Sequence, residues 1–342
     1  MNFNASGRIT LKDVAERCGY TANTVSRALR NDEKLPENTR RIIQQAAREM
    51  GYVPNRSAQA LRYGSSRTIA VIVNDINNPY YANLLSQMEQ GLRKRNYHTM
   101  ILCVQLDEAL ADEMIQLAIS QQVDGILFFP FSNECHIRTL HESGIPFVLI
   151  DRWIPNIEAD IARIDDFDGG YKLTRHLLDL GHREFLYMAG PFVNSSQIDR
   201  QNGIMQALEE AGIESKKHLR VIAWEDISKA TEHGNLISLL EPFDYTAILA
   251  FNDEMAYHAL NALNARGLRV PEDISLTGFD HIRWCNTYLP PLTSITVEKQ
   301  GVASAAIEML FDRMQQPDLP FRHRIIPVKI HMDGTTRAVQ MK

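Results

Sequence analysis

The chain has 342 residues, of which 44% are hydrophobic and 23% are charged. This composition is typical of a soluble globular protein, and the length predicts two or three domains. Apolar runs are of strand length only and the start of the chain has no apolar segment, which argues against a membrane span and a secretory signal peptide. The four cysteines are far apart, which favours thiols in a reducing cytoplasm.

The net charge of −6 is distributed unevenly along the chain. Residues 1–65 hold eleven Lys/Arg and six Asp/Glu, whereas the remainder carries a net charge of −11. A small basic module joined to a large acidic one indicates that only the first part contacts a polyanion. Chance clustering of surface charge is the alternative.

Three short helices are predicted in the first 50 residues. Thr10 and Asp13 have the spacing of a capping box at the start of LKDVAERC, and Thr21 can cap ANTVSRALR. The third helix is expected over about 36–50. Two helices joined by a tight turn at Gly19 predict a helix-turn-helix, whose second helix enters the major groove of DNA. A small helical bundle with a solvated polar face is the alternative.

The second helix supplies the side chains that are expected to contact DNA. Its outer face is predicted to carry Ala22, Asn23, Ser26, Arg27 and Arg30. Asn can pair with adenine and Arg with guanine, whereas Ala offers a methyl contact. Four further polar side chains suit phosphate contacts, which position the protein without reading sequence: Thr10, Thr21, Thr24 and Asn31.

Residues 52–66 are basic and end in Gly-Ser-Ser, a pattern typical of a hinge. From Thr68, apolar strands such as TIAVIV, TMILCV, DGILFF and PFVLI alternate with amphipathic helices, and FLYMAG, LRVIA, TAILAF and ISLTGF form a second series. This alternation predicts two lobes, each with a doubly wound parallel sheet. Helices are expected near 80–94, 107–120, 133–142, 167–180, 198–211, 229–240, 254–265 and 298–314. TSITV and RIIPVKI are expected to complete both lobes.

The pieces DVA, TVSRAL, GYVPN and AQAL, at these spacings, resemble the headpiece and hinge of the lactose-repressor (LacI/GalR) family. NPYY, DGIL, GHR, GFD and PPLTSI extend the resemblance over about residues 8–337. The resemblance implies a transcriptional repressor, not an enzyme, that binds a palindromic operator as a homodimer, needs no cofactor and responds to a small-molecule effector. It also implies a cytoplasmic protein, associated with the nucleoid when bound to DNA.

The same resemblance implies a division of the chain into three parts. A helix-turn-helix headpiece is expected over 1–53, a hinge helix over 54–66 and a periplasmic-binding-protein-like sensor over 67–342. The first lobe is placed at about 67–163 and 293–323, and the second at about 164–292 and 324–338. In the hinge, Asn55, Ala58 and Leu61 are implied to contact DNA, with Leu61 as a wedge in the minor groove.

For the effector, the resemblance implies residues at the carboxyl ends of the strands, where open α/β sheets bind ligands. They are Tyr80, Tyr81, Phe131, Asp151, Arg152, Asn194, Ser196, Arg200, Trp224, Asn252 and Asp280. Either Trp224 or Ile227 can take the aromatic wall position. A pentose, hexose, glycoside or sugar phosphate fits this set. A purine fits less well, because Asn194 stands at a position where the purine-binding relative has an arginine.

Other classes of function find little support in the sequence. There is no GxSxG, no GxGxxG after a strand and no HExxH, which argues against a hydrolase, a nicotinamide dehydrogenase and a zinc protease. The trio Asp165, Asp166 and Asp168 is expected to cap a helix and not to bind a metal. A secreted solute-binding protein with the same two-lobed core is the main rival. Pro36 departs from the family, which usually caps the third helix with Ser.

Overall fold

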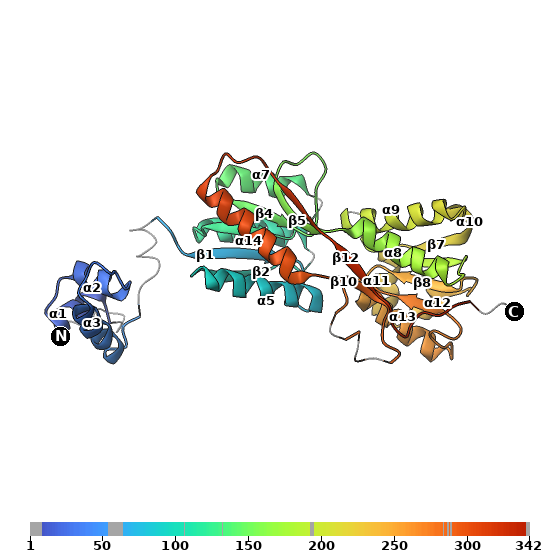
Figure 1. Ribbon diagram of the computed structural model, residues 1–342, viewed down its shortest axis with the longest axis horizontal. Coiled ribbons are helices and arrows are strands. Elements are labelled where there is room, and N and C mark those ends of the chain that lie inside the picture. The colour runs from blue at the N-terminus through green and yellow to red at the C-terminus, as the bar shows by residue number, and fades with distance from the viewer. Residues whose placement is uncertain are drawn as a thin grey trace. The chain divides into compact units, whose positions relative to one another are not determined.

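The computed structural model describes residues 9–53, 64–105, 107–131, 133–191, 195–282, 284–285, 287 and 289–339. The chain divides into two compact units, Met1–Ser66 and Arg67–Lys342, which are described separately (Figure 1). In neither unit do the described residues form a helix that is long and apolar enough to cross a membrane.

The described residues of the first unit form a bundle of three helices, α1 (Leu11–Cys18), α2 (Ala22–Leu29) and α3 (Glu37–Glu49). The predicted capping box at Thr10 and Asp13 is present, and Gly19 ends α1 in the left-handed conformation. Pro36 is the N-cap of α3 and provides no side-chain hydrogen bond. The core of the bundle consists of Val14, Ala15, Val25, Ala28, Ile43 and Ala47.

The first lobe of the second unit contains a six-stranded parallel sheet in the order β11-β5-β4-β3-β1-β2. Its strands are β1 (Thr68–Val73), β2 (His98–Cys103), β3 (Gly125–Phe128), β4 (Phe147–Ile150), β5 (Asp160–Ile164) and β11 (His323–Ile326). Successive side chains of β1 enter two different cores, because strand residues alternate between the faces of a sheet. Helices α5 (Pro79–Lys94) and α14 (Lys299–Gln315) cover one face, and α6 (Glu108–Ser120) and α7 (Glu134–Ser143) cover the other.

The second lobe contains a four-stranded parallel sheet in the order β7-β6-β8-β9. Its strands are β6 (Phe185–Met188), β7 (Leu219–Ile222), β8 (Ala247–Ala250) and β9 (Ser275–Thr277). Its helices are α8 (Asp166–Asp179), α9 (Ser195–Glu210), α10 (Ser215–His218), α11 (Trp224–Glu232), α12 (Leu236–Leu240) and α13 (Asp253–Ala265). Helices α8 and α9 pack closely against each other, as Figure 1 shows.

Three segments connect the lobes. The chain passes from β5 into α8, from β9 through β10 (Ser294–Val297) into α14, and from β11 into β12 (Val328–His331). Strands β10 and β12 pair antiparallel between the lobes (Figure 1). The residues after β12 then run beside β9, where Leu276 N donates to Thr335 O. The tail therefore completes both lobes, as predicted from the sequence.

The predicted fold class, a helix-turn-helix headpiece and a sensor of two parallel-sheet lobes, is confirmed. Three local expectations differ from the structure. Strand β5 was not expected, and the helix expected over 229–240 is two helices separated at Gly234, which has a positive φ. The last run, RIIPVKI, is divided at Pro327, because proline cannot donate to a sheet. The first lobe therefore continues to Ile326 and does not end at residue 323.

Candidate DNA-binding and effector sites

The N-terminal end of α2 presents a polar, exposed surface. Thr21, Ala22 and Asn23 are exposed, and Thr24 is half-buried. The Thr21 side chain accepts from Thr24 N and lies 2.9 Å from the Thr24 hydroxyl, so Thr21 also caps the helix. Thr10 is tied into the capping box of α1, with its hydroxyl 2.8 Å from Asp13 Oδ2. The hydroxyls of Thr21 and Thr24 therefore lie together where the second helix begins.

Two residues further along α2 differ from the expected arrangement. Ser26, expected on the outer face, is buried with 7% exposure. Arg27 is half-buried, and its Nε donates to Asp32 Oδ2 at 2.8 Å. Asn31 is exposed in the turn after α2, with a φ of 61°. Asn55, Ala58 and Leu61, and with them the predicted hinge helix, lie outside the described residues.

In the sensor, side chains of both lobes surround an inner chamber of about 40 Å³. It is lined by Asn78, Tyr80, Tyr81, Asp151, Arg152, Ile164, Ser196, Arg200, Phe251, Asn252 and Asp280. Eight of the predicted effector residues are therefore brought together, although they come from the ends of strands and the starts of helices that are far apart in sequence. Such a volume holds only a few water molecules.

The wall from the first lobe is a network of hydrogen bonds. The Tyr80 hydroxyl donates to Asp151 Oδ1 at 2.8 Å, and burial raises the pKa of the Asp151 carboxyl to about 7. Arg152 donates to Pro130 O and to the Tyr81 hydroxyl, both at 3.1 Å. The directions of both ring hydroxyls are thus set before any ligand enters.

The wall from the second lobe is organised around Arg200, which is 6% exposed. Its Nε donates to Asp166 Oδ1 at 2.8 Å, and its Nη2 lies 3.7 Å from Asp280 Oδ1. The guanidinium lies between two rings, with its carbon 3.6 Å from the centroid of Phe279 and 4.4 Å from that of Phe251. Cation–π attraction and the ion pair together fix the guanidinium plane.

Asp280 stands at the turn after β9 with a φ of 99°. Burial raises the pKa of its carboxyl to about 8, even with Arg200 beside it. Lys299 Nζ donates to the Asp280 carbonyl oxygen at 2.7 Å. The next acidic residue along the cleft, Asp253, accepts from Ile282 N and from the Ser294 hydroxyl, so it braces the loop and does not line the chamber.

An outer chamber of about 310 Å³ opens beside the inner one. Both Trp224 and Ile227 line it, so the two residues that sequence reasoning treated as alternatives belong to the same wall. Phe131, predicted to contact the effector, lines neither chamber; its ring packs in the first-lobe core near His136. Asn194 lies outside the described residues.

Comparison with known proteins places both units in known families. Residues 10–55 match the family model of bacterial regulatory proteins of the lacI family, and residues 174–336 match that of the periplasmic binding protein-like domain. The chain is 30% identical to the HTH-type transcriptional repressor CytR of Escherichia coli (strain K12), over 96% of this chain and 97% of that protein. The chain belongs to the lacI family.

Solved structures agree with this assignment to the lacI family. The lac repressor dimer bound to operator and the anti-inducer ONPF matches with a TM-score of 0.83 and 25% identity, covering 97% of this chain and 100% of that one. The complex of the transcriptional regulator CelR with cellobiose matches with a TM-score of 0.71 and 26% identity, covering 96% and 100%. The chain is a DNA-binding transcriptional regulator of the lacI family with a ligand-binding domain.

Several residues at this lacI-family cleft escaped sequence reasoning. From the sequence, Phe251 and Phe279 were interpreted as ordinary strand ends and Asp166 as a helix-capping residue. In the structure all three contact Arg200. The other two acids of the trio have separate partners: Asp165 caps α8, and Asp168 pairs with Lys172. Among the described residues no group of His, Cys, Asp and Glu has a geometry that could hold a metal ion.

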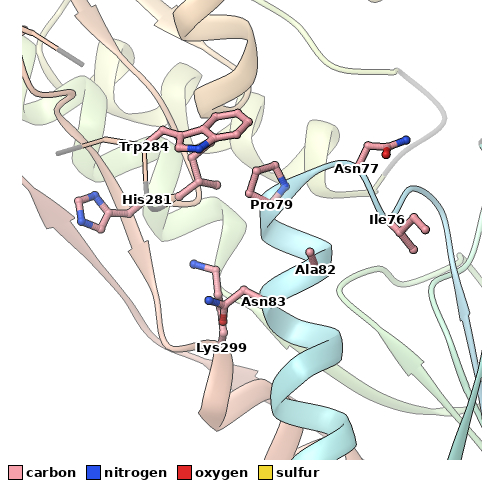
Figure 2. A pocket seen from close by; sticks show the side chains of 9 residues that line it. Ile76, Asn77, Pro79, Ala82, Asn83, His281, Trp284 and Lys299 are labelled. Atoms are coloured by element: carbon pink, nitrogen blue, oxygen red, sulfur yellow. The ribbon is translucent and has the colours of Figure 1, made fainter. Parts of the chain in front are cut away.

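A third cavity, of about 510 Å³, lies between the start of α5 and the loop after β9 (Figure 2). Pro79, Ala82 and Asn83 reach it from the first turns of α5, whereas His281 and Trp284 come from the loop after β9. Lys299, which holds the Asp280 carbonyl, also lines this cavity. Asp280 lines the inner chamber, whereas His281 and Ile282, the next two residues of the same loop, line this cavity.

Proposed function

We propose that the chain is a dimeric repressor that binds a near-palindromic operator and is controlled by a carbohydrate-type effector between the lobes. The observation that carries the proposal is the inner chamber, in which Arg200 and Asp280 of the second lobe face Tyr80 and Asp151 of the first. Carboxylates, a guanidinium and tyrosines are suited to hydroxyl groups in defined directions. The sugar in the CelR complex, cellobiose, is a ligand of this kind.

The headpiece provides the DNA-binding surface in this proposal. Asn23 and Arg27 read base edges in the major groove, and Thr10, Thr21, Thr24 and Asn31 contact phosphates. Ser26 is buried in the bundle, so its contribution is limited to the edge of this surface. The hinge residues Asn55, Ala58 and Leu61 form the minor-groove contact, with Leu61 as the wedge.

Coupling between effector and DNA follows from the position of the inner chamber between the lobes. A ligand that contacts Arg200 and Tyr80 together bridges the two lobes, so it favours one lobe arrangement over another. The first lobe is the part of the sensor that follows the hinge in sequence. A ligand with different affinities for two lobe arrangements can shift DNA affinity by its coupling free energy, typically about 1–3 kcal/mol.

The dimer in this proposal forms through α5 and α13. Two-fold symmetry of the protein then matches the two halves of the operator. The lac repressor structure cited above is itself a dimer on its operator. Light scattering of the purified chain should give the mass of a dimer at micromolar concentration, and a monomer or a stable tetramer would contradict this part.

The function is tested with the full chain on operator DNA selected from a randomised duplex library. A panel of monosaccharides, disaccharides and nucleosides is titrated into the labelled complex, and a responding compound is then titrated with Arg200→Ala. The variant should bind the operator normally, but its response midpoint should rise by about tenfold or more, because charge-assisted hydrogen bonds worth roughly 1.5–3 kcal/mol are lost.

Arg200→Lys keeps a positive charge beside Asp166 and Asp280, and it replaces Arg200→Ala if the alanine variant does not fold. Asp179→Ala, an exposed position on α8, is the matched control and should respond like the wild type. An unchanged midpoint in both Arg200 variants would remove Arg200 from the site and would discredit the cleft assignment.

A further inference from the structure

The sheet of the first lobe has two edges that differ in what they carry. Its six strands are parallel, so their carboxyl ends meet near the effector chambers and their amino ends meet at the opposite edge. The chain enters the sensor at this opposite edge, because Arg67 directly precedes β1. Helix α5 ends there too, at Lys94 (Figure 1). The amino edge of the sheet is therefore the part of the sensor to which the DNA-binding unit is joined covalently.

Four cations gather at this amino edge. Arg93, Lys94 and Arg95 follow one another, and no other three consecutive residues of the sequence are all Lys or Arg. All three are exposed, and so is Arg67. The backbone brings the two segments together, because His98 N donates to Arg67 O at 2.8 Å. These four residues, Arg67, Arg93, Lys94 and Arg95, form the basic edge.

Two aromatic rings support two cations of the basic edge. The guanidinium carbon of Arg67 lies 5.3 Å from the ring centroid of Tyr97, and that of Arg95 lies 5.2 Å from the ring centroid of Phe311. The two rings meet edge to face, with their centroids 4.9 Å apart. A ring face attracts and orients a guanidinium but offers no oxygen to its N–H groups. The basic edge is therefore a packed surface whose donors remain suited to an external anion.

The charge of the basic edge is only partly compensated by neighbouring carboxylates. Arg93 Nε lies 3.4 Å from Glu89 Oε1, but an exposed pair of this kind is weak. Asp124 Oδ2 accepts from Arg67 N, which is a backbone group. In the part of the chain that the structure describes, the other two cations of the basic edge form no ion pair. The chain beyond residue 65 carries a net charge of −11, so this local positive charge contrasts with the rest of the sensor.

The dipole of α5 accounts for only part of this pattern. Arg93 and Lys94 lie in the last turn of the helix, where cations are favourable beside the negative end of the dipole. Arg67 lies outside any helix, and Arg95 is the C-cap, whose guanidinium lies over a ring of α14. The end of α5 therefore does not by itself require all four cations.

We propose that the basic edge is a second DNA-binding surface, which contacts the phosphates of the duplex that the headpiece binds. Residues 54–66 join the two units, and even a fully extended chain spans only about 3.3–3.6 Å per residue. A duplex bound by the headpiece is therefore at a high local concentration for the basic edge. Phosphate contacts add affinity without reading sequence. The inference rests on the DNA binding of the proposed function and is independent of the effector.

The test measures the affinity of the full chain for DNA at several salt concentrations. Lys94→Gln/Arg95→Gln is compared with the wild type on the selected operator and on a random duplex of the same length. Each lost phosphate contact should lower the slope of log affinity against log salt by about 0.9, and affinity at low salt should fall by about tenfold or more on both duplexes. Lys94→Glu leaves the ring contact of Arg95 in place, and it replaces the double variant if that variant does not fold.

The matched control removes two positive charges elsewhere on the sensor. Lys216 and Lys217 are exposed on α10 of the second lobe. Lys216→Gln/Lys217→Gln lowers the net charge of the chain by the same amount and should leave the salt slope unchanged. Glu89→Gln is the opposite change, because it removes the carboxylate beside Arg93, and it should strengthen binding to both duplexes several-fold.

Three results would overturn the inference and leave the proposed function standing. An unchanged slope in the double variant would show that the basic edge does not contact DNA, as expected for a surface that binds an acidic protein. An equal decrease in the α10 control would show that only the net charge matters. A loss confined to the operator would indicate a disturbed headpiece and not a phosphate contact. If the wild type binds neither duplex, the DNA-binding part of the proposed function is wrong as well.

Discussion

Arg163 and Asp199 form an ion pair that joins the two lobes, with Arg163 Nη1 3.0 Å from Asp199 Oδ2. Arg163 belongs to β5 of the first lobe and Asp199 to α9 of the second. The same carboxylate accepts from Trp153 Nε1 at 2.9 Å. Both partners of the pair are less than one-fifth exposed, so the contact is poorly screened by solvent. Asp199 thus holds two donors of the opposite lobe beside the effector chamber.

Asp199→Ala should therefore destabilise the sensor and change the lobe equilibrium. Two half-buried donors lose their acceptor, which costs about 1–3 kcal/mol of unfolding free energy. Thermal unfolding should show a lower Tm, and the effector midpoint on operator DNA should also move. Asp179→Ala removes an exposed ion pair within α8 and should leave both values unchanged. A Tm for Asp199→Ala equal to that of this control would show that the contact contributes nothing.

Arg27→Ala should reduce affinity for the selected operator by about 1–3 kcal/mol and relax one base position. Asp32→Ala should instead strengthen binding to random DNA, because it removes the carboxylate 2.8 Å from Arg27 Nε and leaves the positive charge uncompensated. Gel shifts on operator and random duplexes distinguish the two effects. Equal weakening of Arg27→Ala on both duplexes would show that Arg27 contacts only phosphate.

Gly170→Ala should separate α8 from α9 and disturb Arg200. A Cβ at Gly170 would overlap the Arg200 carbonyl oxygen, which is backbone and cannot turn away. Overpacking of this kind costs about 1–3 kcal/mol, and here it also displaces the effector-binding side chain. We expect a lower Tm and a weaker effector response with normal operator binding. Gly301→Ala meets only ordinary contacts at 3.4 Å and should be neutral or stabilising.

Stability of the sensor should fall as the pH rises from 6.5 to 8. Burial raises the pKa of Asp280 to about 8 and that of Asp151 to about 7, whereas the unfolded carboxyls titrate near 4. In this range the folded state binds more protons, so the stability from a raised pKa is present at low pH and is lost as the pH rises through the folded pKa.

His176, His182 and His281 have a pKa lowered by burial and act in the opposite direction, but only below the unfolded value of 6.5. Asp280→Asn places a neutral amide where the protonated carboxyl group lies, at every pH. The variant should therefore show a smaller decrease of Tm with pH between pH 6.5 and 8. Arg200, Asp253, Lys299 and Asp151 surround this carboxyl in the folded state. Identical slopes for Asp280→Asn and the wild type would contradict the assignment.

Sequence reasoning predicted the elements with clear periodicity and failed where tertiary context decides. Helix α8 and the strand TAILAF follow from their apolar patterns, and their ends in the structure lie within a residue or two of the predicted ones. Strand β5 was missed because Arg163 interrupts its short apolar run, and the ion pair with Asp199 that accommodates this arginine joins residues 36 positions apart. Pro327 signalled a break that reasoning from the apolar run overlooked.

The candidate site shows the same division. Tyr80, Asp151 and Asp280 could be predicted as effector-binding residues because each follows a strand, and the carboxyl ends of parallel strands meet at one edge of a sheet. Phe131 also follows a strand, but its ring packs in the core of the first lobe. The local sequence does not indicate whether this ring faces the core or the cleft. Phe251 and Phe279 hold Arg200 between two faces, an arrangement that depends on the packing of β8 against β9 and not on local sequence.

The path of the chain between the lobes predicts the effect of nonsense mutations that truncate the protein. Neither lobe is a continuous stretch of sequence. The first lobe takes α14 and β11 from the last 45 residues of the chain, and the residues after β12 return to pack beside β9 of the second lobe. A chain that stops early in this region lacks part of the six-stranded sheet and cannot build a sensor. The helices α1, α2 and α3 at the other end build their core within one contiguous segment. Late nonsense mutations are therefore expected to separate the DNA-binding unit from its control.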